Sequence, residues 1–147
     1  MGFGVSGSTA VIFLGVLIAS GTLYTAAAGT AEQVSEARSA EGEELLDRRN
    51  TVINVASVTY NNSTDTLNVT VTNNGTTTLS VEDTSFLVDN EYVRPTTTAV
   101  DGNGATDVWA PDQALVVTVT ADPTPDRVKA VAENGVAASN TTVEEVG

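Results

Sequence analysis

The feature that most constrains this chain is a long uncharged stretch near its N-terminal end. No charged side chain precedes Glu32, and residues 8–28 within that stretch form the run STAVIFLGVLIASGTLYTAAA. A helix of that length spans about 31 Å, which matches the hydrocarbon core of a bilayer. Phe13 and Tyr24 lie toward opposite ends of the run, where aromatic rings favour the membrane interface. We therefore predict a transmembrane helix over residues 8–28, preceded by a short segment, residues 1–7.

A cleaved secretory signal is the alternative for this stretch. Such signals combine a basic segment, a shorter apolar core and a cleavage site of small residues. Residues 1–7, MGFGVSG, contain no Lys or Arg, and the apolar run that follows is longer than a signal needs. The pattern favours a retained anchor, with cleavage after residues 26–28 as the alternative.

One face of the predicted membrane helix consists of small residues. Gly21, Thr25 and Gly29 recur every four positions, so they share one side of the helix. Small residues at this spacing let a second helix approach closely, which makes them a candidate helix-packing face. Gly is also common in membrane helices generally, so the pattern has a second explanation that involves no partner.

Residues 29–50 have the composition of a helix outside the membrane. Ala, Glu, Gln, Leu and Arg dominate this segment, and all of them are good helix formers. Glu44 and Arg48 are spaced as a favourable i,i+4 pair. We predict a helical stalk over residues 29–50 that continues the anchor, with a partly frayed linker as the alternative.

From residue 51 the apolar period changes to alternation. Leu67, Val69 and Val71 alternate with polar residues, and Leu115, Val117 and Val119 recur at the same spacing of two further on. This pattern is typical of strands with one buried face. The alternation slips by one position near Val55, which indicates a β-bulge. Turn signals separate the runs, among them Asn74-Gly75, which we expect to supply positive φ angles to a tight hairpin.

These patterns predict about seven to eight short strands in residues 51–147. Their number and spacing suit an all-β, immunoglobulin-like sandwich. The Cys–Trp–Cys pattern of antibody domains is not present, because the chain has no cysteine. Trp109 is the only tryptophan, and we expect it to pack in the core. The alternative is that Trp109 is exposed and anchors an interface.

The composition excludes several kinds of chemistry. With neither Cys nor His, the chain cannot form a disulfide or a metal site built on thiolate or imidazole, and it lacks the commonest general base near neutral pH. Its serines therefore have no His partner, and Lys129 is the only lysine. We expect no catalytic residue, no metal and no cofactor, and a protein that acts by binding other proteins.

The net charge of −13 limits the partners further. Such a chain is repelled by nucleic acid and by anionic lipid surfaces. Disorder is disfavoured, because 41% of the residues are hydrophobic and many lie in regular patterns. In molar salt the Debye length is roughly 3 Å, so repulsion among carboxylates costs little while they keep the surface hydrated. We therefore expect a halophilic source, with an acidic but non-halophilic surface protein as the alternative.

Sequons for N-linked glycosylation bear on the orientation of the chain. The motif Asn-x-Ser/Thr marks a candidate glycan site only on an exposed segment outside the cell. Five positions fit the motif: Asn61, Asn62, Asn68, Asn74 and Asn140. The three arginines after the apolar run would by themselves favour a cytoplasmic C-terminal part, but large domains translocate largely regardless of charge. We predict that residues 51–147 lie outside the membrane on the extracytoplasmic side.

Several segments resemble a known family. The opening MGFGVSGSTAVIFLGVLIASGTLYTAA, the helix end LLDRRNT and the run TLNVTVTNNGTTTLSVEDTSFLVDNEYV are similar to the haloarchaeal FlaF (ArlF) proteins. These are accessory, stator-type proteins of the archaellum, the archaeal swimming filament. The resemblance spans essentially the whole chain, and its N-terminal part is the more specific.

The resemblance implies properties that the residues alone do not. It implies a single-pass protein of the cell membrane with a β-sandwich in the pseudoperiplasm, binding to the S-layer protein, a FlaG-like partner, and a homodimer of the soluble domain. By this resemblance, the protein and its FlaG-like partner would together hold the archaellum motor to the cell envelope. The nearest alternatives are FlaG itself and a filament subunit, either a minor archaellin or a pilin, whose N-terminal helix packs into the fibre core.

Overall fold

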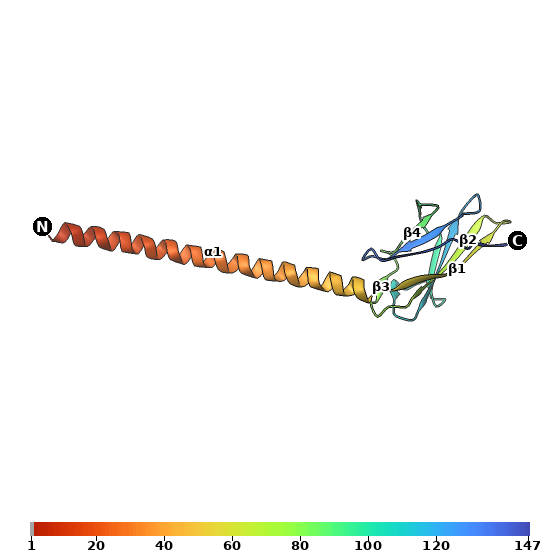
Figure 1. The fold of residues 1–147 in the computed structure, drawn as a ribbon, viewed down its shortest axis with the longest axis horizontal. Coiled ribbons are helices and arrows are strands. Elements are labelled where there is room, and N and C mark those ends of the chain that lie inside the picture. Colours follow the sequence, from red (N-terminus) through yellow and green to blue (C-terminus); the bar gives the residue numbers. More distant parts are fainter. Residues whose placement is uncertain (1) are drawn as a thin grey trace. The chain divides into compact units, whose positions relative to one another are not determined.

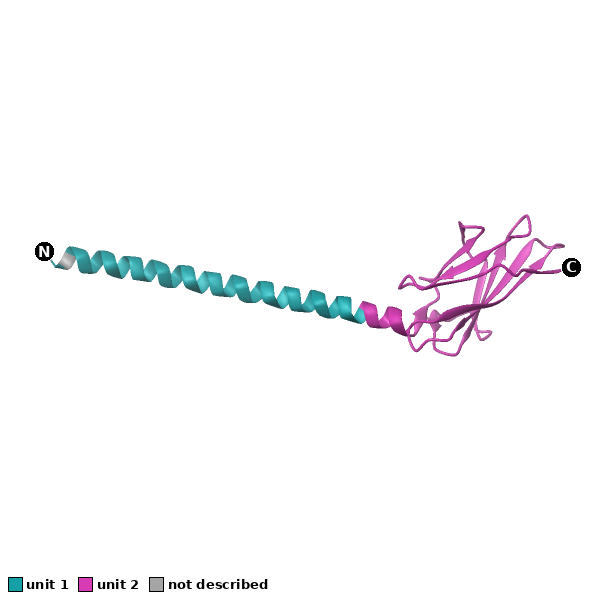
Figure 2. Ribbon diagram, in the orientation of Figure 1, with its two compact units in different colours: residues 1–43 teal, residues 44–147 magenta. Residues whose placement is uncertain are grey.

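The computed structural model describes residues 2–147, which divide into two compact units. The units are Met1–Glu43 and Glu44–Gly147 (Figure 2). The first unit consists of helix α1 (Phe3–Asn50), whose last residues belong to the second unit. All β-strands lie in the second unit, and Figure 1 follows the chain from α1 into them.

Helix α1 exposes its apolar side chains in the described part of the first unit. Ile12, Leu14 and Tyr24 are more than half exposed, and the helix is long and apolar enough to cross a membrane. Its hydroxyl groups bond back to the helix itself, as in the bonds from Thr9 to the Val5 carbonyl at 2.8 Å and from Ser20 to the Val16 carbonyl at 2.7 Å. Hydroxyls satisfied in this way are compatible with a hydrocarbon environment. The helix is thus suited to single-pass anchoring.

The second unit is a β-sandwich, which confirms the predicted fold class. Its larger sheet has the order β11-β1-β2-β8-β6, with β11 parallel to β1 and the other neighbours antiparallel. The strands are β1 (Ile53–Asn61), β2 (Thr66–Asn73), β6 (Thr97–Val100), β8 (Ala114–Thr120) and β11 (Glu144–Val146).

The second sheet has four antiparallel strands in the order β10-β9-β4-β5. Its strands are β4 (Ser85–Val88), β5 (Glu91–Val93), β9 (Val128–Val131) and β10 (Ala137–Asn140). A two-stranded sheet pairs β3 (Leu79–Ser80) with β7 (Val108–Trp109). The described residues thus form eleven strands, more than the seven to eight predicted, because strands of two to four residues are too short to show an alternation.

The core lies between the two sheets and follows the predicted alternation. Leu67, Val71, Leu115 and Val117 are each 0% exposed, whereas the residues that alternate with them, mostly polar, face outward. Phe86 of the second sheet packs in the same cluster. Burying such side chains contributes about 1.5–3 kcal/mol each, which makes this cluster the main stabilising element of the unit.

The predicted β-bulge near Val55 is confirmed. The register between β1 and β2 shifts between Val55 and Ser57. The Nδ2 group of Asn140 on β10 donates a hydrogen bond to the Val55 carbonyl at 3.2 Å. A bulge interrupts the ladder locally, and here a side chain from the other sheet supplies a partner for a strand carbonyl.

A buried asparagine organises one end of the sandwich. Asn73 is 0% exposed, and its Nδ2 group donates to the carbonyls of Thr77 at 2.8 Å and Trp109 at 3.2 Å. Its Oδ1 accepts from the Gly75 amide at 3.1 Å. Because each buried polar group needs a partner, this one side chain satisfies three backbone groups that would otherwise be unpaired.

Replacing Asn73 with Ala should therefore destabilise the fold. We expect the free energy of unfolding to fall by about 2–4 kcal/mol, because the backbone groups lose their buried partner. Chemical denaturation of the full chain in detergent measures this change. The matched control is Asn54→Ala, an exposed Asn of the same sheet, which should shift the value by less than about 0.5 kcal/mol. Equal effects of the two substitutions would contradict the role assigned to Asn73.

Candidate functional site

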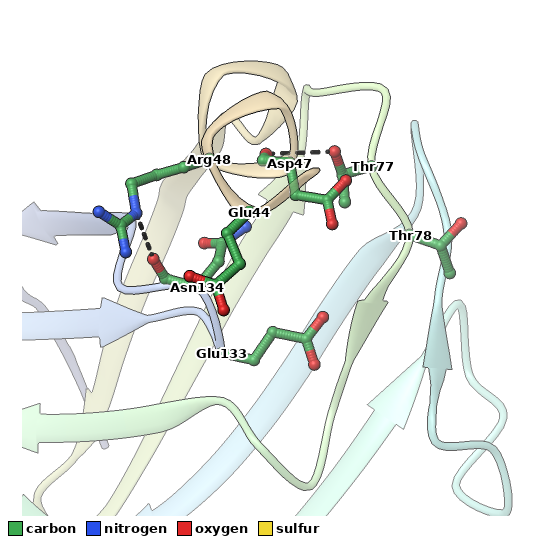
Figure 3. A pocket seen from close by; sticks show the side chains of 7 residues that line it. All are labelled: Glu44, Asp47, Arg48, Thr77, Thr78, Glu133 and Asn134. Atoms are coloured by element: carbon green, nitrogen blue, oxygen red, sulfur yellow. Dashed lines mark hydrogen bonds between the residues drawn. The ribbon is translucent and has the colours of Figure 1, made fainter. Parts of the chain in front are cut away.

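The C-terminal end of α1 is bound by a loop of the sandwich. The last carbonyls of a helix have no partner within it. The Asp47 carbonyl accepts hydrogen bonds from the hydroxyls of Thr51 at 2.6 Å and Thr77 at 3.3 Å, and the Asn50 carbonyl accepts from the Thr76 amide at 2.8 Å. All of these residues lie in the second unit. The loop after β2 therefore caps the helix, and Figure 3 shows the bond between Asp47 and Thr77.

A second loop holds the same end of the helix from another side. The Nε group of Arg48 donates to the Asn134 carbonyl at 3.0 Å, as drawn in Figure 3. The Nδ2 group of Asn134 donates to the Thr51 hydroxyl at 2.6 Å, and Thr51 is only 4% exposed. The Thr51 hydroxyl thus links the helix to the loop before β10. We call the contacts of residues 47–52 with residues 74–77 and 134 the helix–sandwich junction.

Gly75 lies at the centre of the junction for steric reasons. A Cβ atom at this position would overlap the Asn50 carbonyl oxygen and would lie 2.6 Å from the Val52 amide nitrogen. Both obstacles are backbone atoms, which cannot move aside cheaply. The prediction that Asn74-Gly75 supplies positive φ angles is wrong, because neither residue has a positive φ. Gly75 is therefore needed because two backbone segments approach each other closely here, and not because the chain adopts a left-handed conformation.

A shallow hollow of about 350 Å³ lies beside the junction. Figure 3 shows its lining residues: Glu44, Asp47, Arg48, Thr77, Thr78, Glu133 and Asn134. Three carboxylates and one guanidinium line this hollow, and its Arg48 and Thr77 groups already bond to protein carbonyls. No group of His, Cys, Asp or Glu that could hold a metal ion occurs among residues 2–147 as described. The hollow is thus lined by residues of the junction and of its neighbouring loops.

Tyr60 is a titratable side chain that is buried in the core cluster, with 2% of its surface exposed. Its hydroxyl donates to the Asp65 carboxylate at 3.2 Å and to the Ala121 carbonyl at 3.1 Å. Burial and the negative charge of Asp65 raise the pKa of Tyr60. Both causes favour the neutral phenol, so this group serves as a hydrogen-bond donor that ties the turn after β1 to the loop after β8.

The five sequons differ in how their side chains are engaged. Asn62 and Asn74 are exposed in turns, and Asn68 is exposed in the middle of β2, where its Oδ1 accepts from the Thr118 hydroxyl at 2.9 Å. The Oδ1 of Asn61 accepts from two backbone amides of its own turn, and Asn140 is engaged at the bulge. The sequence did not distinguish these positions, because the hydrogen-bond partners come from other strands and loops.

The candidate helix-packing face remains a prediction. Gly21, Thr25 and Gly29 are exposed on α1, and a Cβ atom at either glycine would meet nothing within 4 Å. The Thr25 hydroxyl donates to the Thr22 carbonyl at 3.0 Å, so it is satisfied within the helix.

The alternative in which Trp109 is an exposed interface anchor is wrong. Trp109 is 0% exposed and packs in the core, and its Nε1 group donates to the Gln113 carbonyl at 3.0 Å. A buried indole needs this partner for its polar end. The sequence did not indicate the contacts of the junction, such as those of Gly75 and Asn134, because their partners are far away in the chain.

Replacing Gly75 with Ala should loosen the junction. The added Cβ must displace backbone atoms of residues 50–52, and overpacking of this kind costs about 1–3 kcal/mol. We expect a lower free energy of unfolding and faster hydrogen exchange of the Thr76 amide in the full chain in detergent. The control is Gly42→Ala, where a Cβ meets nothing within 4 Å and the helix should gain about 0.5–1 kcal/mol. Unchanged exchange at Thr76 in Gly75→Ala would refute this account of the junction.

Comparison with solved structures finds matches of low sequence identity and with TM-scores below 0.5. The archaellum periplasmic stator protein FlaG from Sulfolobus acidocaldarius has 17% identity and a TM-score of 0.46, covering 61% of this chain and 97% of that one. The FlaF–FlaG stator complex from the same organism gives 16% identity and a TM-score of 0.44, covering 60% and 85%. The ligand-binding region of serine-glutamate repeat protein A from Enterococcus faecium gives 15% and 0.39, covering 67% and 98%.

Comparison by sequence gives a match over almost the full length. No curated protein matches the chain. Residues 2–142 match the archaeal-type flagellin family, which includes both the apolar helix and nearly all of the sandwich. This chain therefore belongs to the archaeal-type flagellin family.

Proposed function

We propose that the chain is a membrane-anchored accessory protein of the archaellum that fixes the motor to the cell envelope. Membership of the archaeal-type flagellin family supports a part in the archaellum. The apolar helix supports single-pass anchoring. The similarity of the opening residues and of LLDRRNT to haloarchaeal FlaF (ArlF) supports the accessory role and a halophilic source.

The observation that carries this proposal is the helix–sandwich junction. An anchor resists force only if the bound domain cannot rotate freely on a flexible linker. Here the Asp47 and Asn50 carbonyls at the end of α1 are bonded to the loop of Thr76 and Thr77, and Arg48 is bonded to the Asn134 carbonyl. A load on the sandwich therefore passes directly into the backbone of the helix.

The partners follow from the same role. A fluid bilayer cannot resist torque, so the sandwich must bind a structure that is fixed in the envelope. We propose that it lies on the extracytoplasmic side and binds the S-layer protein together with a FlaG-like protein. The function requires contact and no chemical step, so the protein is proposed not to be an enzyme. A homodimer of the sandwich is part of the same proposal.

A filament subunit, either a minor archaellin or a pilin, is the second candidate function. It is favoured by the family itself and by an α1 whose apolar side chains are exposed, since a fibre core covers such a helix as well as a bilayer does. The two functions differ in where the chain resides. Sequencing of the mature N-terminus and mass spectrometry of purified filaments distinguish them, because a subunit is present in the filament and an accessory protein stays in the membrane fraction.

Deletion of the gene should abolish or strongly reduce swimming. We expect filaments that turn poorly, because the motor has lost its fixed frame, and rescue by the wild-type chain. Tracking of single cells measures swimming, and electron microscopy shows whether filaments assemble. A deletion strain that swims normally would refute the accessory role, and purified filaments that contain the chain would establish the second candidate instead.

Glycans should occur at only some of the five sequons. We propose an extracytoplasmic sandwich modified at Asn62 and Asn74, because both are exposed in turns. We expect no glycan at Asn140, whose Nδ2 group is used at the bulge, or at Asn61, which forms its own turn. Mass spectrometry of peptides from native membranes measures occupancy. Occupancy at Asn140 equal to that at Asn74 would contradict this selection.

A further inference from the structure

The outward face of the four-stranded sheet differs in composition from the rest of the surface. The registers of β5, β4, β9 and β10 place Tyr92, Leu87, Lys129 and Ser139 in one row across the sheet. Their strand neighbours alternate inward, as the 0% exposure of Ala130 shows. Tyr92 is 65% exposed, and the other members of the row are exposed or half-buried.

A second row beside the first contains no charged residue. The registers place Ser85, Val131 and Ala137 next to one another on β4, β9 and β10. Val131 and Leu87 are half-buried but do not belong to the core cluster or pack against it. We call these two rows the Tyr92–Lys129 face. An exposed tyrosine with aliphatic neighbours is typical of the centre of a binding interface.

The basic residues of the sandwich gather at this face. Residues 51–147 contain three basic side chains, namely Arg94, Arg127 and Lys129, in a chain with 19 acidic residues. Arg94 directly follows β5 and Arg127 directly precedes β9, so both lie at strand ends of this sheet. Both arginines are exposed. Carboxylates also lie at the strand ends: Glu91 is exposed on β5, and the Oδ1 of Asp89 accepts from the Arg127 amide at 2.9 Å.

The outward face of the larger sheet provides a contrast. Strands β1, β2, β8 and β6 contain no charged residue at all, and their outward side chains are mostly Thr, Asn and Ser. Val116 is a partly exposed apolar side chain on this face, and the charges of this sheet are the carboxylates of Glu144 and Glu145 on its edge strand β11, so the sheet offers a partner no basic side chain. The Tyr92–Lys129 face combines an exposed aromatic side chain, Tyr92, with a basic one, Lys129.

We propose that the Tyr92–Lys129 face binds another protein through a surface that carries carboxylates around an apolar patch. Tyr92, Leu87 and Val131 supply apolar area, while Lys129 and the two arginines select negative charge. A second copy in symmetric contact would place Lys129 near its own equivalent and is disfavoured. A membrane surface is disfavoured because the net charge of −13 repels anionic lipids.

This inference rests on the proposed function, since it names the chemistry of the partner that an envelope-bound adaptor requires. It predicts that the partner surface is acidic at the point of contact. Ion pairs at such an interface are shielded by apolar neighbours, so Lys129 should affect binding more than an isolated surface lysine would.

Site-specific crosslinking in native membranes tests the proposal. The chain has no cysteine, so a single introduced cysteine is the only position labelled. Ser139→Cys places a photoreactive maleimide next to Lys129, and Thr120→Cys places it on the outward face of the larger sheet; both positions are exposed in the full chain. We expect an adduct with a different protein from Ser139→Cys and none from Thr120→Cys.

Charge substitutions then test the chemistry of the contact. In the Ser139→Cys chain, Lys129→Gln should lower the adduct yield at least about fivefold, because a charge pair of the interface is lost. Thr70→Glu changes the net charge by the same amount on the other sheet and should leave the yield unchanged. Circular dichroism confirms that both variants fold.

Each other outcome overturns the proposal. An adduct with a second copy refutes the proposed occupant. Absence of any adduct at Ser139, equal adducts at both positions, or a yield insensitive to Lys129→Gln refutes the face. Swimming of the deletion strain is a separate readout. If the deletion strain cannot swim and Ser139→Cys gives no adduct, the proposed binding face is wrong while the accessory role stands. If the deletion strain swims normally, the accessory role is wrong, whichever adducts form.

Discussion

The way in which the end of α1 is joined to the sandwich depends on which groups donate hydrogen bonds to the last carbonyls of that helix. A helix that ends in water bonds its last carbonyls to solvent, and the chain after it is then free to turn. Here Thr51, Thr76 and Thr77 provide the donors, and Gly75 allows the loop to approach the Asn50 carbonyl. The last turns of the helix, from Glu44 on, are therefore part of the same compact unit as the sandwich.

Apolar, acidic and uncharged polar side chains occupy different parts of the surface of this chain. The apolar side chains described on α1 are exposed, carboxylates occupy most loops, and strands β1, β2, β8 and β6 of the larger sheet carry no charge. In a chain of net charge −13, nonspecific contacts with other acidic proteins are disfavoured everywhere. A face that combines Tyr92 with Lys129 is therefore the place where the general repulsion is locally reversed.

Local periodicity was a good guide to several elements. The apolar run of residues 8–28 predicted helix, the alternation of Leu67, Val69 and Val71 predicted a strand with one buried face, and the slip near Val55 predicted the bulge. Each of these patterns is contained within a few residues. The short strands β3 and β7 escaped prediction because two residues hold no period, and their pairing depends on segments almost thirty positions apart.

The sequence by itself determined that the chain has an apolar helix, a β-sandwich without disulfides and an acidic surface, because composition and short-range periodicity specify burial in a helix or strand. The tertiary structure decided that Trp109 is buried, that Gly75 is required by a neighbouring backbone, and which sequon side chains are engaged. It also brought Tyr92 and Lys129 into one row. These features depend on the register between strands far apart in the chain, which is set by packing of the whole core and not by any local pattern.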